Sequence, residues 1–203
     1  MSTKLFTAKL FTAKLLVAGL LTTVALGQAQ AAPTSQDGTG PYAGIELARA
    51  HFGISSALPS TARDSQATGG RLYGGYRFTP NFGLEAGYAG LGSMSETVTV
   101  GGGAVTQDAK ARSLYAAGTA QMPLTDALAL RGKLGVSRGK VWGANQLPAA
   151  NSLIGSSTSL MGGLGLDYRL NRDITLTADY SHYGQVSDKV RASSVGIGAK
   201  LAF

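Results

Sequence analysis

The ionisable side chains of this 203-residue sequence form two groups that could support chemistry. The first group is small, because the chain has no cysteine and only two histidines, His51 and His182. The second group is a series of charges that alternate with other residues inside apolar segments. Ionised groups that are withdrawn from water persist only when they are paired and hydrogen-bonded, so this series predicts a structural network of ion pairs. Its members are Glu46, Arg71, Arg77, Glu85, Arg131, Lys133, Asp167, Arg169, Asp179 and Lys200. Within this series we expect Arg77 to pair with Glu85 across the tight hairpin.

The histidines give little support for catalysis or for metal binding. Ser181 and His182 are adjacent, and neighbours in a strand face opposite sides, so they cannot form a nucleophile–base pair within that strand. We expect His182 on the side of the charged residues or just above the rim. Without cysteine or an acidic loop of fixed spacing, we expect no metal site and no cofactor.

The first 31 residues differ in character from the rest. Three lysines precede an uncharged run over 15–26, and the small residues of 29–31 form a cleavage site. This pattern predicts a signal peptide over 1–31 and a mature domain over 32–203. Its apolar run is shorter than the roughly 20 residues that a spanning helix needs. The remaining lysines and arginines are scattered along the chain, so we expect no nucleic-acid binding.

From Pro41 onward, apolar residues recur at every second position, which indicates β-strands. Three connections are tight turns with Pro, Asn and Asp, at 79–81, 123–127 and 171–173. Four connections are long, at about 53–69, 91–110, 139–157 and 183–190. Short turns at one end and long loops at the other predict an all-β fold, an eight-stranded antiparallel up-and-down transmembrane β-barrel. The expected strands are 42–52, 71–78, 81–88, 113–122, 128–136, 164–170, 174–180 and 193–203.

The two faces of these strands differ in charge. One face is free of charge, from Ala43, Ile45 and Leu47 to Ile197, Leu201 and Phe203, whereas the other face holds the alternating charges. A soluble barrel would turn its charged face to water. An export signal, and acids and bases that can neutralise one another in a lumen, favour the apolar face outside. Aromatic residues near the strand ends predict two interfacial girdles. They are Tyr42, Phe78, Phe82 and Phe203 at the turn end, and Phe52, Tyr88, Tyr180 and Tyr183 at the loop end.

Several stretches resemble the OmpA-like transmembrane-domain family of eight-stranded outer-membrane barrels. They are 69–94 (GGRLYGGYRFTPNFGLEAGYAGLGSM), 121–135 (QMPLTDALALRGKLG), 166–184 (LDYRLNRDITLTADYSHYG) and the terminal AKLAF. The resemblance covers essentially the whole mature chain. It implies that the last strand pairs with the first and that Phe203 is a C-terminal signal read by the outer-membrane insertion machinery. The peptidoglycan-binding domain of the full-length namesake has no counterpart before Phe203, so we do not expect wall tethering.

These observations together predict an exported, non-enzymatic protein of the bacterial outer membrane. Its barrel would be a scaffold that presents surface loops for adhesion, recognition or envelope integrity, because binding usually resides in loops on a rigid frame. A narrow channel for small solutes or ions is the alternative, and a lipid-modifying enzyme is a weaker one. The expected partners are outer-membrane lipid, lipopolysaccharide and the insertion machinery, with an unidentified loop ligand.

Overall fold

The computed structural model describes residues 38–55, 60–100, 103–144 and 153–203, and every regular element in these ranges is a β-strand. No helix among the described residues is long and apolar enough to cross a membrane. The signal peptide predicted over 1–31 lies outside the described residues. The strands are β1 (Gly40–Ile54), β2 (Ser60–Asp64), β3 (Gln66–Arg77), β4 (Phe82–Val100), β5 (Gly103–Pro123), β6 (Leu128–Ala144), β7 (Gly155–Arg169), β8 (Ile174–Ser187) and β9 (Val190–Ala202).

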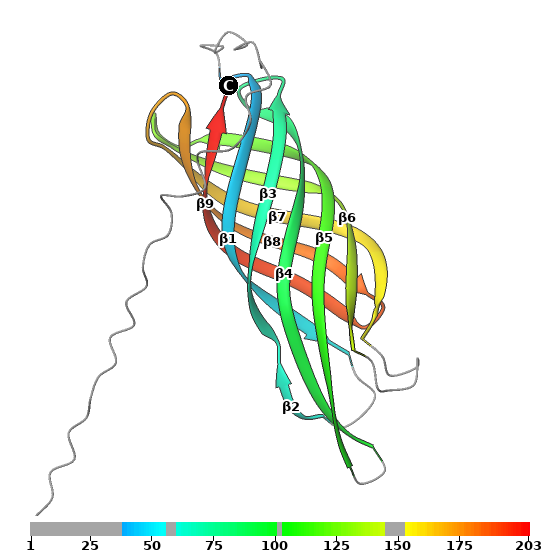
Figure 1. Cartoon of the computed structure of the whole chain (residues 1–203). Coiled ribbons are helices and arrows are strands. Elements are labelled where there is room, and N and C mark those ends of the chain that lie inside the picture. The colour runs from blue at the N-terminus through cyan, green and yellow to red at the C-terminus, as the bar shows by residue number, and fades with distance from the viewer. Residues whose placement is uncertain (1–37, 56–59, 101–102, 145–152) are drawn as a thin grey trace, which may run out of the picture. The chain divides into compact units, whose positions relative to one another are not determined.

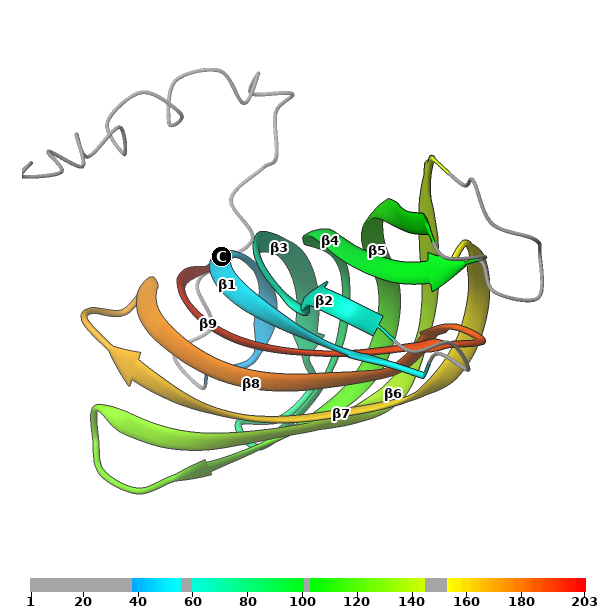
Figure 2. The same ribbon diagram turned by 90° about the horizontal axis from the view of Figure 1, so that it is seen from below.

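The strands close into one antiparallel barrel (Figures 1 and 2). Neighbours in the sequence pair with one another from β3 to β9, and β1 pairs with both β3 and β9. The short strand β2 pairs with β4 just beyond the point where β3 stops pairing, so β2 and β3 together count as one strand of the barrel wall. We call each of these wall strands a stave. The barrel therefore has eight staves, and the predicted fold class is confirmed. Closure leaves no sheet edge within the span, because each strand of the wall there pairs with a neighbour on both sides.

The closing pair explains the alternating pattern at the end of the chain. Tyr42 of β1 lies opposite Ala202, and the ladder runs through Glu46 opposite Gly198 to Ile54 opposite Val190. The Phe203 amide donates to the Pro41 carbonyl at 3.1 Å, one residue beyond the last pair of this ladder. Lys200 is buried in the lumen, as its place on the charged face predicts.

The three tight turns use the same local chemistry. A side-chain oxygen accepts the amide of the residue that starts the next strand. Thr79 Oγ1 accepts from Phe82 at 2.9 Å, and Thr125 Oγ1 accepts from Leu128 at 3.0 Å. Asn171 Oδ1 accepts from the Ile174 amide at 2.7 Å. These local hydrogen bonds fix where each strand begins, which is why the turns are predictable from sequence.

The four predicted long loops are wrong in extent, because strands run through most of them. The range 91–110 is the continuation of the β4–β5 hairpin, whose ladder extends to Val100 opposite Gly103. The range 183–190 contains the end of β8, a tight turn at 188–189 and the start of β9. The middle of 139–157 lies outside the described residues. Small and hydroxylated residues led us to expect loops here, yet paired backbone at the rim tolerates them as well.

In the half of the barrel nearer the tight turns, the outer face of the wall is apolar and the inner face is polar. Large apolar side chains such as Leu134, Leu160 and Ile197 are 70–75% exposed, which is unusual unless lipid covers them. Two glycines with positive φ, Gly92 and Gly184, lie at register shifts in β4 and β8. Such bulges need φ values that other residues rarely adopt, and they increase the local twist of the wall.

Candidate functional site

The charges predicted to form a network lie on the inner face of the wall. Glu46, Arg71, Glu85 and Arg131 are at most 4% exposed, although they come from four different strands. Lys133, Asp167, Asp179 and Lys200 are also buried. Strand parity places them there, because each alternates with a lipid-facing residue on its own strand. We call these eight residues the lumen network.

Arg131 of β6 is the centre of the lumen network. Its Nη1 lies 3.3 Å from Glu85 Oε2 and its Nε lies 3.1 Å from Asp167 Oδ1, while Nη2 pairs with Asp179 Oδ2. Lys200 Nζ pairs with the other oxygen of Asp167 at 2.6 Å. One guanidinium therefore joins carboxylates from β4, β7 and β8, as its planar fork of five donors allows.

A second guanidinium extends the network toward β1. Arg71 Nη2 lies 2.5 Å from Glu46 Oε2 and 3.0 Å from Asp179 Oδ2. Lys133 Nζ lies 2.8 Å from Asp179 Oδ1, so this carboxylate contacts three cations. The ion pairs consequently form one continuous network with members on β1, β3, β4, β6, β7, β8 and β9.

Two tyrosines add hydrogen bonds to the Glu85 carboxylate. Tyr115 donates to Glu85 Oε1 at 2.7 Å, and Tyr42 donates to Glu85 Oε2 at 3.2 Å. The ring of Tyr73 lies 4.9 Å from the Arg71 guanidinium carbon, within cation–π range. Sequence analysis identified the charges but missed that Tyr42 and Tyr115 are partners of Glu85. Strand alternation could have predicted that Tyr42 faces the lumen, because Tyr42 and Glu46 are four residues apart on the same strand and share a face.

Two of the ten predicted residues are not part of this network. Arg169 is exposed at the turn end of β7, and Arg77 is half-buried and donates to Gln121 Oε1 at 3.3 Å. The expected pairing of Arg77 with Glu85 is wrong, since Glu85 contacts Arg131 instead. Without these two arginines the lumen network holds four carboxylates and four cations. It is therefore neutral overall, as burial in a low-dielectric lumen requires.

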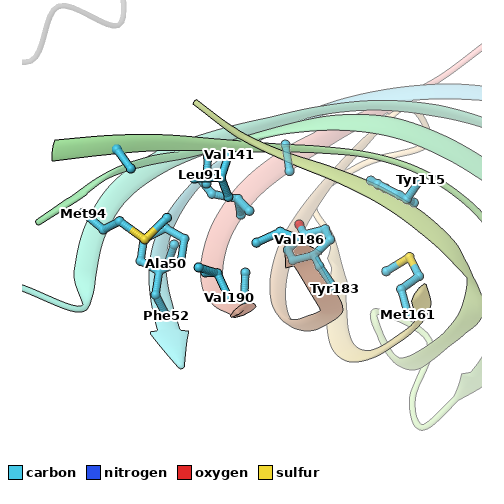
Figure 3. Close-up of a cluster of buried hydrophobic side chains, with 14 of the residues drawn as sticks. Ala50, Phe52, Leu91, Met94, Tyr115, Val141, Met161, Tyr183, Val186 and Val190 are labelled. Carbon is cyan, nitrogen blue, oxygen red and sulfur yellow. The ribbon is translucent and has the colours of Figure 1, made fainter. Parts of the chain in front are cut away.

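A second, apolar layer fills the lumen on the loop side of the network (Figure 3). Leu91, Met94 and Val141 contribute from β4 and β6, and Val186 and Val190 contribute from β8 and β9. Val141, Val186 and Val190 are fully buried. A Cβ atom at Gly139 would collide with Val186, so the wall and this layer are in close contact. The sequence pattern did not suggest an apolar plug, because alternation alone does not assign a side.

The predicted aromatic girdles are partly wrong. Phe78, Phe82 and Phe203 face outward at the turn end, and Tyr88 and Tyr180 face outward on the loop side. In contrast, Tyr42, Phe52 and Tyr183 are buried inside the barrel. Our expectation used their position near strand ends and ignored parity. Tyr42 and Phe52 alternate in step with Glu46, and Tyr183 alternates in step with Asp179, so all three face inward.

The turn end of the lumen opens into a cavity of about 680 Å³. Arg77, Asp167 and Lys200 line it, so it reaches the edge of the lumen network and stops there. Arg169 and Phe203 also border it. The lumen thus has three successive parts: an open mouth, a layer of ion pairs and an apolar plug.

The residues considered for catalysis do not form a catalytic site. Ser181 is buried and accepts a hydrogen bond from Arg71 Nη1 at 2.8 Å. His182 is exposed on the outer face, so the expectation that it lies on the lumen side is wrong, because Asp179 and Ser181 fix the parity of β8. His51 is also exposed. Among the described residues, no group of three or more His, Cys, Asp or Glu side chains could hold a metal ion.

Comparison with known proteins identifies the family. The family described as outer membrane protein beta-barrel domain matches residues 18–203. Outer membrane protein A of Klebsiella aerogenes is 31% identical over 180 residues, which cover 83% of this chain and 46% of that protein. The chain thus spans about half the length of this curated relative.

Solved structures show the same fold at lower identity. Neisserial surface protein A has a TM-score of 0.56 at 19% identity, and the match covers 81% of this chain and 97% of that one. The outer membrane protein OprG of Pseudomonas aeruginosa has a TM-score of 0.51 at 18% identity, covering 81% and 98%. The attachment invasion locus protein Ail of Yersinia pestis has a TM-score of 0.51 at 20% identity, covering 81% and 99%. With its closed eight-stave wall and lipid-facing exterior, the chain belongs to the outer membrane protein beta-barrel domain family and is an OmpA-like barrel of the outer membrane.

Proposed function

We propose that this protein is a non-conducting, non-enzymatic scaffold whose activity resides on its outer surface. The observation that carries the proposal is the filled lumen. The lumen network joins all staves except β5 through charged groups, and Tyr115 of β5 donates to it. Eight-stranded barrels have interiors just wide enough for side chains, and here ion pairs and an apolar plug occupy that interior in series.

Two features argue against the channel alternative. A permeating ion would have to separate pairs such as Glu46 with Arg71, at a cost of several kcal/mol per uncompensated charge. It would then have to pass the apolar layer around Val186, whose buried aliphatic side chains cannot replace its hydration shell. The mouth cavity gives access from the turn end only as far as Asp167 and Lys200.

The surface that a scaffold would present is the extended rim on the loop side. The β3–β4 ladder ends at Gly70 opposite Gly90, whereas the β4–β5 ladder continues to Val100 opposite Gly103. The hairpin therefore projects beyond the neighbouring strands, with β2 paired along its side (Figure 1). Long loops of such barrels face the cell exterior, so this projecting sheet is the part that a partner outside the cell meets first.

Planar-bilayer recording tests the proposal directly. The refolded barrel should add no steady current at potentials of either sign. The matched comparison is Arg131→Ala, which removes the central guanidinium of the lumen network and should admit water and transient currents if it still folds. Sustained single-channel openings of the unmodified protein would contradict the closed lumen and support the channel alternative.

A further inference from the structure

Four cations are grouped on the outer wall of β5 and β6. Lys110 and Arg112 lie on β5, and Arg138 and Lys140 lie on β6, and all four side chains are exposed on the outside of the barrel. We call these residues the outer-wall cluster. They are separate from the lumen network, because their strand parity is that of the lipid-facing residues Leu114 and Leu134.

The outer-wall cluster begins where the apolar belt ends. On β6 the outward residues run from Leu128 through Leu134 and Val136 to Arg138, ten residues beyond Leu128. With a rise of about 3.3 Å per residue and a tilt of about 40°, ten residues advance roughly 25 Å along the membrane normal. This distance equals the height of the apolar band in such barrels. The cluster thus lies at the loop-side boundary of the membrane, at the depth of the lipid headgroups.

The same spacing recurs on the neighbouring strand. Arg112 lies ten residues from Met122, an exposed apolar residue near the turn end of β5. Arg112 and Lys140 are directly opposite each other in the β5–β6 ladder. Like charges in this position repel one another. Across the described side chains, no carboxylate lies within ion-pair distance of any member of the cluster. An anion from outside the chain would relieve this repulsion.

The surroundings of the cluster favour a sugar phosphate over a simple anion. The Arg112 guanidinium lies 5.2 Å from the ring centre of Trp142, which is 38% exposed and offers a flat apolar face at the interface. On the other side, the exposed hydroxyls of Ser156 and Thr158 lie opposite Lys140 and Arg138. These groups can accept and donate hydrogen bonds beside a phosphate.

An acidic residue, Asp108, lies beside the outer-wall cluster near Lys110 and would repel an anion there. Asp108 is exposed and lines a hollow of about 260 Å³ together with Lys110 and Trp142. A phosphate would therefore bind toward Arg112, Arg138 and Lys140, away from this carboxylate. Lys110 then offsets the charge of Asp108 and contributes less to anion binding.

We propose that the outer-wall cluster binds a phosphorylated glycolipid headgroup of the outer leaflet. Arg112, Arg138 and Lys140 contact the phosphate, Trp142 and the β7 hydroxyls contact the sugar, and the acyl chains lie along Leu114, Val136 and Leu160. The proposal commits to a lipid because the cations are continuous with this lipid-facing surface. It goes beyond the scaffold role, since it holds whether or not the lumen conducts.

The test compares Arg138→Gln/Lys140→Gln with the matched control Arg169→Gln/Arg172→Gln. Both variants remove two exposed positive charges, but the control residues lie at the turn end of the barrel. Each protein is refolded in neutral detergent, and binding of a diphosphorylated lipid A is measured by native mass spectrometry. The same glycolipid without phosphates, and inorganic phosphate alone, are the two further probes.

We expect the cluster variant to bind the diphosphorylated glycolipid at least about tenfold more weakly than the parent, because two charge-assisted contacts are lost. The control variant should bind like the parent, and the parent should bind the dephosphorylated glycolipid as weakly as the cluster variant does. Equal binding by the parent and the cluster variant would overturn the proposal. Inorganic phosphate that binds as tightly as the glycolipid would also overturn it, by showing a free-anion site. If the cluster variant does not fold, Lys140→Gln alone takes its place with the same readout.

Discussion

At the scale of single residues, the interior of this barrel depends on a few side chains with several partners each. Arg131 contacts three carboxylates, and Asp179 contacts three cations. Removal of one member leaves others charged and buried, which is more costly than the net value of any single pair. Glu85 is a suitable residue for a measurement, because Arg131 is its one ion-pair partner among the described residues.

We expect Glu85→Ala to lower the free energy of unfolding by about 3–5 kcal/mol, because it strands part of the Arg131 charge and the hydroxyls of Tyr42 and Tyr115. Urea unfolding in lipid vesicles, followed by the gel shift between unheated and boiled samples, measures this loss. In a double-mutant cycle, Glu85→Ala with Arg131→Ala should be non-additive by about 0.5–3 kcal/mol.

The matched cycle uses Arg77→Ala, whose side chain contacts Gln121 instead. Its combination with Glu85→Ala should be additive within about 0.5 kcal/mol. Strong coupling of Glu85 to Arg77, together with none to Arg131, would show that the interior is paired differently.

At the scale of elements, the strands differ in how much the barrel needs them. Within the span, each stave completes the hydrogen bonds of two neighbours, and loss of any one would open the wall. Beyond the span, the outer part of the β4–β5 hairpin is paired with β2 and is not needed for closure. The membrane-spanning staves are therefore required for folding, whereas the outer part of the β4–β5 hairpin is available for display at the surface.

Replacing residues 95–108 with a two-residue Asn-Gly turn should therefore leave folding intact. The turn would join Met94 to Ala109, which are already opposite each other in the ladder. The gel shift and the yield in lipid vesicles measure folding. The contrasting variant deletes Ala117 alone, within the span of β5, and should fail to fold because a one-residue slip turns every later side chain of that segment to the other face. Failure of the hairpin variant, with normal refolding of the Ala117 deletion, would reverse this assignment.

At the scale of the whole molecule, stability comes from an arrangement that is opposite to that of a soluble protein. Leu134, Leu160 and Ile197 are exposed, whereas the lumen network is buried. Lipid covers the apolar wall, and the ion pairs neutralise one another inside. Charge is therefore tolerated in the lumen or at the rim and is costly on the wall.

Leu134→Arg should lower the free energy of unfolding in vesicles by about 2–4 kcal/mol, because this residue is 71% exposed within the apolar belt. Gln185→Arg, at an exposed position near the loop-side end of β8, should change it by less than about 1 kcal/mol. Urea titrations of the two refolded variants provide the comparison. Equal losses would mean that the two sites meet the same environment and that the membrane position is wrong.

The sequence by itself determined the local features of this protein. The placement of Glu46 and Leu134 on opposite faces of the wall and the three tight turns follow from a two-residue period and turn chemistry. Strand number follows from the same pattern. These features depend on residues close together in the chain, so they need no knowledge of how distant strands are placed.

The tertiary structure decided which inward residues meet. Glu85 pairs with Arg131, which is 46 residues away, and not with Arg77 across the nearby hairpin. The alternation of side chains along a strand shows whether a residue faces inward or outward, but not its position along the barrel axis. The tilt and stagger of the strands set that position, and hence which side chains meet across the lumen. For the same reason, the apolar plug around Val186 and the extension of β4 and β5 beyond the membrane were not predictable. Both depend on where each strand stands relative to the others in the closed barrel.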